Sequence, residues 1–467
     1  MVSTWSKVTS FLTGSNSMSD VLPDPIEHVV VLMLENRSFD HMLGGLSALG
    51  LDGALPAGAG TRQNEDPAGN RFEQVDGASR TLRFDPHHEL NHVAAQMAGG
   101  NLGFVSDFTR AFPKSSSDDR AEIMKYHTDL PALHTLAKNF TVCDHWFSSV
   151  PGPTWTNRFF VHSGTSLGRV EMPNGILDAN LHWYDQPTVY DRLNERGKAW
   201  NIYYGDIPQS LMLVNQLEPH NACRYKKMIQ FYQDVGRHPA VPFPSYCFIE
   251  PSYYEPGAND DHPTHDVAAG DRLIANVYNA LRANPNLWSK TLLVVLYDEH
   301  GGFYDHVEPP AAVPPDHHRE EYEFNQLGLR VPAILVSPYA AKKIVKTQFD
   351  HTSLLRYLSD KWTLGPLGER TRQATSFASE LLDKPRADCP ETLPLTGPPG
   401  KVVLATGRPM LSSHQSALFA MTQLLESMTD VAGDDLKGRV SRMIVGFDGA
   451  VDVGMERVED FLSQQRN

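Results

Sequence analysis

Two apolar runs of this chain each end in a pair of acidic or amide side chains. The pairs are Glu35 and Asn36, after residues 26–34, and Asp298 and Glu299, after residues 291–297. If the runs form neighbouring strands of a parallel sheet, the four side chains meet at one edge of that sheet. Several carboxylates together are unfavourable unless a cation or protons neutralise them, and oxygen-rich sets suit divalent metals. The paired pattern therefore indicates a metal site, although each pair taken alone is more typical of a cap on a following helix or loop.

A hydroxyl group is expected at the start of a helix in the segment VPGPTWTNRFFVHSGTS, residues 150–166. Gly and Pro make a sharp entry to Thr154, and a helical pattern continues from there. A hydroxyl at that point lies beside free backbone N–H groups and the positive end of the helix, which favours a phosphoryl group and a lowered hydroxyl pKa. Asn157, one turn on, is placed to donate to a phosphate oxygen. Taken alone, Thr154 or Thr156 is more readily explained as an N-cap.

Histidines are numerous, at 20 in the chain, and several lie in short loop-like segments rich in Asp, Pro and Gly. Neutral imidazole can bind a metal, and imidazolium can bind phosphate or protonate a leaving oxygen. Any one of them is more commonly a surface or structural residue than a catalytic one. The histidines in these segments are His87 and His88, His262 and His265, and His300 and His306.

The elements that must position these groups alternate between strands and helices. Val-rich or apolar runs predict strands at residues 26–34, 199–205, 245–250, 291–297 and 331–337. Helical spacing predicts helices at residues 131–140, 266–284 and 351–362. This alternation predicts an α/β fold with a mostly parallel central sheet and helices on both faces. Such a sheet places its functional site at the carboxyl ends of its strands.

The chain divides by composition into three parts. Residues 1–24 resemble a flexible leader, residues 25–384 hold the predicted catalytic domain, and residues 385–467 begin with a connector and continue as a mainly helical C-terminal appendage. Residues 50–85 are expected to form a long surface excursion. The formal net charge of −15 argues against a nucleic-acid partner, which needs clustered Lys and Arg.

The same motifs resemble a known enzyme family. The segments ENRSFDHMLG, TWTNR, NDDHPTHD and DEHGGFYDHVEPP are similar to those of the bacterial phospholipase C and acid phosphatase A phosphoesterase family, to which plant non-specific phospholipase C also belongs. The resemblance covers roughly residues 25–365, with the motifs in the same order. It implies the fold of the alkaline phosphatase superfamily for the catalytic domain.

The resemblance also implies roles for individual residues. It implies a divalent metal centre, of calcium, magnesium, manganese or zinc, with a nucleophilic Thr154 as both attacking group and metal ligand. The implied metal ligands are Glu35, Asn36, Thr154, Asp298 and Glu299. The implied phosphate contacts are His88, Asn157 and His262, with His262 also protonating the leaving alcohol, and with His182 as a weaker candidate. Relatives often have Pro-Asn-Arg after the nucleophile, whereas this chain has Thr156-Asn157-Arg158, which makes Thr156 a rival hydroxyl.

Phospholipase C activity is the expected function, with glycerophospholipids such as phosphatidylcholine as substrates and diacylglycerol and a phosphorylated head group as products. An acid phosphatase acting on soluble phosphomonoesters is the alternative within the family. Aromatic residues near the motifs could form a box for a quaternary ammonium group, although core packing is the commoner role for such residues. These residues are Trp155, Trp183, Tyr184, Tyr253 and Tyr254.

Two rival functions come from other classes. Gly164-Thr165-Ser166-Leu167-Gly168 matches the GxSxG pattern of a serine hydrolase, in which Ser166 follows a strand and precedes a helix. A scaffold protein on a decayed phosphoesterase fold is the second rival, and it would be favoured by loss of Glu35, Thr154 or Asp298. All three are present.

The cellular setting is expected to be the cytoplasm, because neither a signal peptide nor an uncharged apolar stretch of ~18 residues is visible in the sequence. Secretion is the alternative if a signal was trimmed. Contact with a membrane is expected to be transient and confined to its surface. The four cysteines contain no CxxC pair, which argues against a thiolate zinc site and favours unpaired thiols. Oligomeric state cannot be inferred from the sequence.

Overall fold

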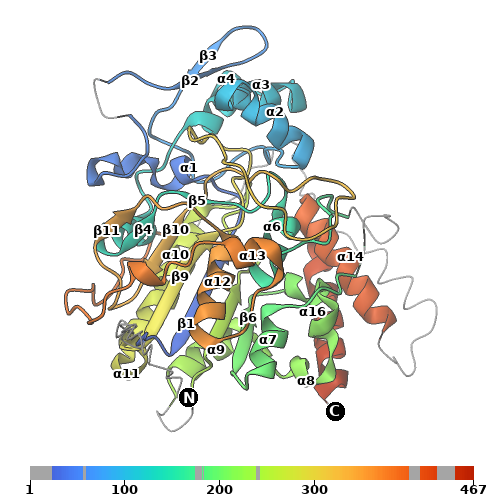
Figure 1. Cartoon of the computed structure of the whole chain (residues 1–467). Coiled ribbons are helices and arrows are strands. Elements are labelled where there is room, and N and C mark those ends of the chain that lie inside the picture. The colour runs from blue at the N-terminus through green and yellow to red at the C-terminus, as the bar shows by residue number, and fades with distance from the viewer. Residues whose placement is uncertain are drawn as a thin grey trace, which may run out of the picture.

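An eight-stranded sheet is the centre of the computed structural model, which describes residues 24–55, 59–173, 181, 183–237, 242–398, 411–428 and 447–466 (Figure 1). The strands lie in the order β11-β4-β10-β9-β1-β8-β6-β7. Their bounds are β1 His28–Leu34, β4 Thr141–Cys143, β6 Trp200–Tyr204, β7 Tyr225–Lys227, β8 Tyr246–Glu250, β9 Thr291–Tyr297, β10 Ala333–Val336 and β11 Lys343–Val345. Two small sheets pair β2 (Gln63–Glu65) with β3 (Arg71–Glu73) and β5 (Trp146–Phe147) with β12 (Phe349–Asp350).

The sheet is mostly parallel, as the alternation of elements predicts. The exception is β10, which runs antiparallel to both β9 and β4. The central strands β1 and β9 are buried almost along their whole lengths, which fits their unbroken apolar sequences. The predicted α/β class is therefore confirmed.

Helices flank both faces of the sheet; α6 and α12 contact each other on one face, and α5 and α10 do so on the other (Figure 1). The α-helices are α1 Phe39–Leu43, α2 Leu90–Asn101, α3 Phe104–Ala111, α4 Ser117–Ala121, α5 Pro131–Asn139, α6 Thr154–Ser163, α7 Val189–Glu195, α8 Pro219–Ala222, α9 Met228–Val235, α10 Val267–Ala283, α11 Pro285–Trp288, α12 His351–Trp362, α13 Gly368–Gln373, α14 Ser413–Ser427 and α16 Phe447–Arg466. Short 3-10 turns are η1 Gly44–Leu49, η2 Glu122–Met124, η3 Gln209–Met212, η4 Val214–Leu217 and η5 Ala378–Glu380. Among the described residues, no helix combines the length and apolar character that crossing a membrane requires.

The C-terminal helices α14 and α16 pack against each other and share the hydrophobic core of the sheet. Met421 and Leu425 of α14 and Phe461 of α16 are buried in that core. Helix α16 also contacts α8. The expected C-terminal appendage therefore contributes two helices to the main core, and its standing as a separate domain stays a prediction.

Strands β1 and β9 are parallel neighbours, with Leu34 opposite Tyr297 at their ends. Glu35 and Asp298 therefore leave the sheet side by side. Asn36 adopts a left-handed conformation, with φ of 55°, which asparagine tolerates better than most residues. Gly301 approaches the Asn36 carbonyl so closely that a Cβ atom would lie 1.9 Å from its oxygen, so this position requires glycine.

A buried ion-pair network around Arg330 connects the loops that follow β1 and β9. The guanidinium donates from Nη2 to Asp40 Oδ1 at 3.0 Å and from Nε to Asp305 Oδ1 at 2.8 Å. Its Nη1 donates to the carbonyl oxygens of Asp52 and Asp144, both at 2.9 Å. The aspartates of the FDH and YDH motifs thus pair with Arg330 and hold the loops after β1 and β9.

Replacing Arg330 with Met should lower the free energy of unfolding by about 3–5 kcal/mol, because Asp40 and Asp305 would remain buried without their cation. Arg356→Met is the matched control, since Arg356 pairs with Asp360 one helical turn away in an exposed setting. Its effect should stay within about 0.5 kcal/mol. Urea unfolding measures both, and equal effects would contradict the structural role of Arg330.

Candidate active site

Thr154 and Asn36 form the centre of the site. Thr154 is the first residue of α6 and is fully buried, and its Oγ1 donates to Asn36 Oδ1 at 3.2 Å. The backbone N–H of Asn36 donates to Asp298 Oδ1 at 3.0 Å. The start of α6 therefore meets the ends of β1 and β9, as the sequence predicts.

Arg158 joins the carboxylates of the two strand ends. Its Nη2 lies 3.1 Å from Glu35 Oε1, and its Nε donates to Asp298 Oδ2 at 3.0 Å. All three side chains are completely buried. Arg158 was not among the predicted site residues, although its place in the TNR motif, one residue after Asn157, was a usable signal.

One guanidinium does not balance the acidic groups here. Burial raises the pKa of Glu35 well above its usual range, and nearby Asp298, Asp260 and Glu299 raise it further, while Arg158 lowers it. Burial and Glu299 raise the pKa of Asp298 to about 7, against the opposite effect of Arg158. The site thus disfavours ionised carboxylates unless a further cation is bound.

A divalent cation fits the donors that this edge offers. Glu35 Oε2 and Glu299 Oε1 are buried and lack a hydrogen-bond partner in the part of the chain that the structure describes. Asn36 Oδ1 and Thr154 Oγ1 supply neutral oxygens beside them. Among the described residues, two other groups have three His, Cys, Asp or Glu ligand atoms within 4.8 Å of one another, whereas Glu35, Asp298 and Glu299 do not. These three side chains must therefore move closer together to share an ion.

His88 and His262 lie next to this centre with their rings 5.9 Å apart. His88 Nε2 is 3.1 Å from Asn36 Nδ2, and its Nδ1 donates to the Pro86 carbonyl at 2.9 Å. Burial lowers the pKa of His88, but Glu299, Glu89 and Asp85 outweigh burial and raise the pKa to about 9. These carboxylates therefore favour the imidazolium form of His88.

His262 has the opposite character. Burial, reinforced by His88, His265 and His414, lowers the pKa of His262 well below its usual range, so its ring is neutral. Its Nδ1 donates to the Pro263 carbonyl, which leaves a lone pair on Nε2. That buried Nε2 has no hydrogen-bond partner among the described residues. A neutral ring in this tautomer accepts a proton more readily than it donates one to a leaving alcohol.

Asn157 is engaged with the turn that precedes Thr154. Its Oδ1 accepts from the Val150 N–H at 3.0 Å, and its Nδ2 donates to the carbonyl oxygens of Val150, Gly152 and Pro153 at 3.2, 2.9 and 3.2 Å. The amide thus holds the turn in place. A phosphate contact from Asn157 would require it to exchange one of these bonds and stays a prediction.

The rival hydroxyls face elsewhere. Thr156 Oγ1 donates to the Arg169 carbonyl at 3.3 Å, and Ser166 Oγ donates to the same carbonyl at 2.6 Å. The residues before Ser166, RFFVHSG, belong to helix α6 and its C-cap rather than to a strand. The strand-to-helix turn that a serine hydrolase needs is therefore missing from this described segment, and the Ser166 hypothesis is wrong.

His414, on the C-terminal helix α14, is a component that the sequence analysis missed. Its Nε2 lies 3.5 Å from Glu35 Oε1, and its ring packs against Tyr253 with centroids 4.7 Å apart. Neither ring nitrogen has a hydrogen-bond partner in the described ranges. No local pattern could have signalled His414, because it follows Glu35 by several hundred residues and reaches the site only through the packing of α14.

Several other candidate residues have different settings. His265 Nδ1 pairs with Asp260 Oδ1 at 2.7 Å, and the Asp260 carbonyl accepts from the Glu35 N–H. His182 lies outside the described residues.

The aromatic residues considered for an ammonium box include four that are buried in the hydrophobic core, namely Trp155, Tyr184, Tyr253 and Tyr254. Their placement favours core packing.

Comparison with known proteins gives consistent matches. The model of the Phosphoesterase family matches residues 26–365. Non-specific phospholipase C6 of Arabidopsis thaliana is 35% identical over 406 residues, which cover 80% of this chain and 76% of that protein. Phospholipase C B of Mycobacterium tuberculosis is 29% identical over 431 residues, covering 78% of this chain and 80% of that protein.

Solved structures are only distantly similar. A protein in the alkaline phosphatase superfamily from Vibrio parahaemolyticus aligns at 9% identity with a TM-score of 0.35, covering 77% of this chain and 73% of that one. The family match spans most of the chain, including both strand ends and the start of α6. This chain belongs to the phosphoesterase family, and its enzyme class is that of the phosphoric ester hydrolases.

Proposed function

We propose that this enzyme is a phospholipase C that hydrolyses glycerophospholipids such as phosphatidylcholine to diacylglycerol and a phosphorylated head group, with Thr154 as its nucleophile. The observation that carries the proposal is the buried Thr154 hydroxyl, at the start of α6 and 3.2 Å from Asn36 Oδ1. The plant and mycobacterial relatives, both named phospholipases C, support the substrate class.

A divalent metal is part of the proposal. Glu35, Asn36, Asp298 and Glu299 would hold it together with Thr154. Oxygens of Glu35 and Glu299 have no hydrogen-bond partner among the described residues, and the surplus negative charge of the carboxylates suits a hard or borderline cation. Calcium, magnesium, manganese and zinc are the candidates. A bound metal would supply positive charge that favours ionisation of the Thr154 hydroxyl and balances the charge of the phosphate.

The first chemical step transfers the phosphoryl group to the protein. Thr154 Oγ attacks phosphorus and forms an Oγ–P bond while the bond from phosphorus to the diacylglycerol oxygen breaks. His262 Nε2, with its free lone pair, is assigned as acceptor of the Thr154 proton. His88, whose raised pKa favours the imidazolium form, is assigned as donor of a proton to the leaving oxygen.

The second step releases the head group. A water oxygen forms a new bond to phosphorus as the Oγ–P bond breaks, which yields the phosphorylated head group and returns Thr154 to its hydroxyl form. His88, now neutral, accepts the proton of that water, and His262 returns its proton to Thr154. Asn157 is assigned to holding the turn at residues 150–153, so that the Thr154 hydroxyl stays aimed at the site.

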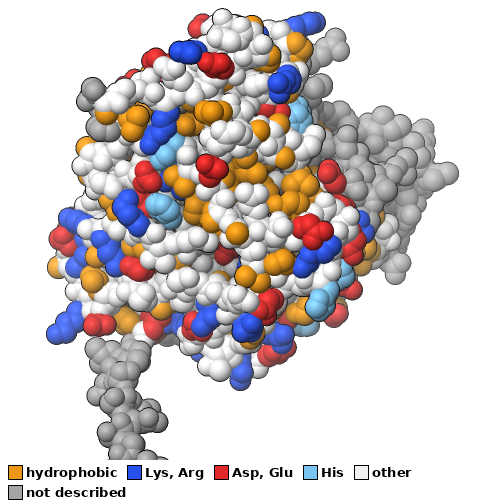
Figure 2. All heavy atoms as spheres, turned by 45° about the horizontal axis from the view of Figure 1, so that its top comes forward, with side chains coloured by type: hydrophobic (Ala, Val, Ile, Leu, Met, Phe, Trp, Pro, Cys, Tyr) orange, Lys and Arg blue, Asp and Glu red, His pale blue; other side chains and the backbone are white. Residues whose placement is uncertain are grey.

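The surface above the site suits a lipid substrate. Figure 2 brings the top of Figure 1 forward and shows hydrophobic side chains gathered over the middle of this face, with histidine and acidic side chains beside them. Three leucines in the N-terminal part of the chain are also exposed to solvent. Leu49, Leu55 and Leu102 are 43%, 39% and 55% exposed. We assign these apolar groups to transient contact with a membrane surface, where acyl chains are available.

The substrate class is tested by supplying phosphatidylcholine vesicles and p-nitrophenyl phosphate to the purified enzyme in parallel. Release of phosphocholine from the vesicles is the expected result. Hydrolysis of the small monoester alone would contradict the phospholipase assignment and identify an acid phosphatase instead.

Thr154→Ala should lower kcat/KM by roughly 10³-fold or more, because the attacking atom is removed. Thr154→Ser should retain part of the activity, since it keeps the hydroxyl. Thr156→Ala is the control and should stay within about tenfold of the wild type, because Thr156 bonds Arg169 instead of facing the site. Loss of activity in Thr156→Ala with survival in Thr154→Ala would assign the nucleophile to Thr156.

The pH profile tests the role of His88. Its pKa is raised to about 9, so the imidazolium predominates below that pH and is lost as the pH rises through it. If the cation acts as proton donor, kcat/KM should fall above about pH 9. His88→Gln should lower kcat/KM by roughly 10²–10⁴-fold and should also lose this alkaline limb. An unchanged limb in the variant would exclude His88 as its source.

Removing bound metal with a chelator should abolish activity and lower the melting temperature, since Glu35, Asp298 and Glu299 would repel one another. Restoring one ion at a time should identify the cofactor. An ion present at 100 times its Kd should restore about 2.7 kcal/mol of stability. Glu35→Gln should reduce the stability that the ion restores, because one of its ligands is lost. Full activity after chelation would contradict the metal-dependent mechanism.

A further inference from the structure

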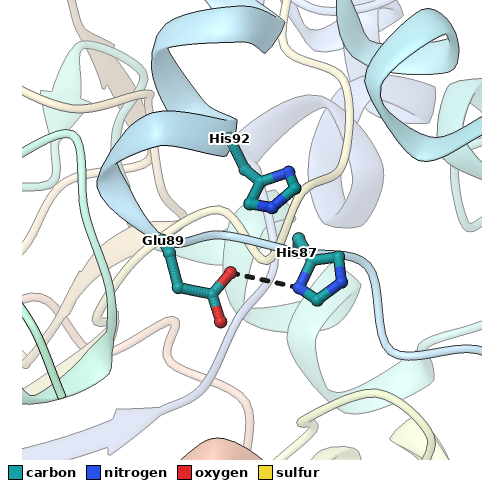
Figure 3. A group of neighbouring side chains, drawn as sticks. All are labelled: His87, Glu89 and His92. Atoms are coloured by element: carbon teal, nitrogen blue, oxygen red, sulfur yellow. Dashed lines mark hydrogen bonds and ion pairs between the residues drawn. The ribbon is translucent and has the colours of Figure 1, made fainter. Parts of the chain in front are cut away.

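A second group of metal-binding side chains lies at the start of α2, outside the candidate active site. His87 and Glu89 precede the helix, and His92 lies in its first turn (Figure 3). One ligand atom from each residue lies within 4.8 Å of the others. His87 Nδ1 and Glu89 Oε2 are 3.2 Å apart, close to the roughly 3.3 Å that separates two ligands of a tetrahedral zinc ion.

The third ligand, His92, is held in the state that metal binding requires. Its Nδ1 lies 3.0 Å from Asp107 Oδ1, so Nδ1 carries the proton and Nε2 carries the lone pair. Asp107 is itself fixed by Gln96, whose Nε2 donates to Asp107 Oδ2 at 3.0 Å. A carboxylate behind a histidine in this way is the usual support of a metal-binding imidazole.

The charge and exposure of the group also suit an ion. Burial raises the pKa of Glu89, but the hydrogen bond with His87 and the charge of the nearby His88 have the opposite effect. Together they hold the pKa far below its usual range, so the carboxylate is ionised. The side chains of His87, Glu89 and His92 are 39%, 28% and 25% exposed, which lets an ion reach them from solvent.

A contrasting group shows what excludes a cation. Asp40, Asp305 and His306 also have ligand atoms within 4.8 Å of one another. There the guanidinium of Arg330 bonds both aspartates and already supplies the positive charge. The group at the start of α2 contains no such cation among the described residues, apart from the ionisable histidines themselves.

We propose that His87, Glu89 and His92 bind a zinc ion, with water completing its coordination. Two imidazoles and one carboxylate suit zinc better than calcium or magnesium, which prefer oxygen ligands alone. The imidazole rings of His87 and His92 stack with centroids 4.4 Å apart and 17° between their planes. One ring must turn about its Cβ–Cγ bond when the ion binds, because a ligand nitrogen binds in the plane of its ring.

This zinc ion would position the loop that carries His88. Gln96 donates to the His87 carbonyl at 2.7 Å, and its Oε1 lies 2.8 Å from His300 Nε2. His300 Nδ1 in turn lies 3.3 Å from Glu299 Oε2 at the candidate active site. An ion at His87 thus fixes the residue next to His88 without touching the substrate.

Zinc titration of the metal-stripped full-length protein by calorimetry tests the proposal. The wild type should bind zinc at two kinds of site. His92→Gln should raise the Kd of one site by at least about tenfold, since loss of even an outer-shell partner costs 10–100-fold. Glu35→Gln should raise the Kd of the other site. An unchanged isotherm in that variant would contradict the active-site metal proposal and leave the proposal for His87, Glu89 and His92 unaffected.

His318→Gln is the matched control. His318 also pairs with a glutamate, with Nδ1 3.0 Å from Glu320 Oε1, and is 48% exposed, but no third ligand joins it among the described residues. Its zinc isotherm should equal that of the wild type. As a second readout, cobalt bound in place of zinc should show visible absorption that is weaker in His92→Gln than in the wild type and unchanged in His318→Gln. Equal zinc affinity and cobalt absorption in His92→Gln and the wild type would overturn the proposal.

Discussion

Electrostatic repulsion among buried carboxylates is the constraint around which this molecule is built. The parallel pairing of β1 with β9 brings Glu35 and Asp298 to one edge of the sheet, and Glu299 follows directly. Arg158 pairs with Glu35 and Asp298, but Asp298 still has a pKa raised to about 7 and Glu35 one raised well above its usual range. A buried arrangement of this kind persists only when other interactions hold it, and it creates a strong preference for a bound cation.

Much of the surrounding structure holds these groups in place. Arg37 donates to the Asp261 carbonyl at 2.7 Å and thereby fixes the loop that carries His262. Gly301 permits the close approach of the loop after β9 to Asn36. Arg330 pairs with Asp40 and Asp305 and so connects the loops that follow β1 and β9. Helix α14 closes it by packing His414 against Glu35 and Tyr253. The family motifs therefore contain both structural residues and site residues.

Sequence patterns were sufficient to predict the strands and helix starts whose formation depends on neighbouring residues in the chain. Unbroken apolar runs predicted the buried strands β1, β8 and β9, and the Gly-Pro entry predicted the start of α6 at Thr154. The reversed direction of β10 was not predictable, because strand direction depends on the path of the chain between elements.

Side-chain partners posed a different problem. Asn157 bonds the turn at residues 150–153, and Arg158 bridges two strands, yet neither partner is visible from spacing along the chain. His414 reaches Glu35 only after distant segments have packed together. The histidine tautomers likewise depend on carbonyl groups that folding places beside them, so the acid and base roles proposed for His88 and His262 do not follow from residue type.

The claim that Thr154 is the nucleophile can be tested by trapping the covalent intermediate. The enzyme is mixed with phosphatidylcholine, quenched in acid within one turnover and digested, and the peptides are examined by mass spectrometry. A phosphocholine group on Thr154, absent from Thr154→Ala, is the expected result. A modified peptide with the group on another residue, or turnover with no covalent adduct at any quench time, would contradict it.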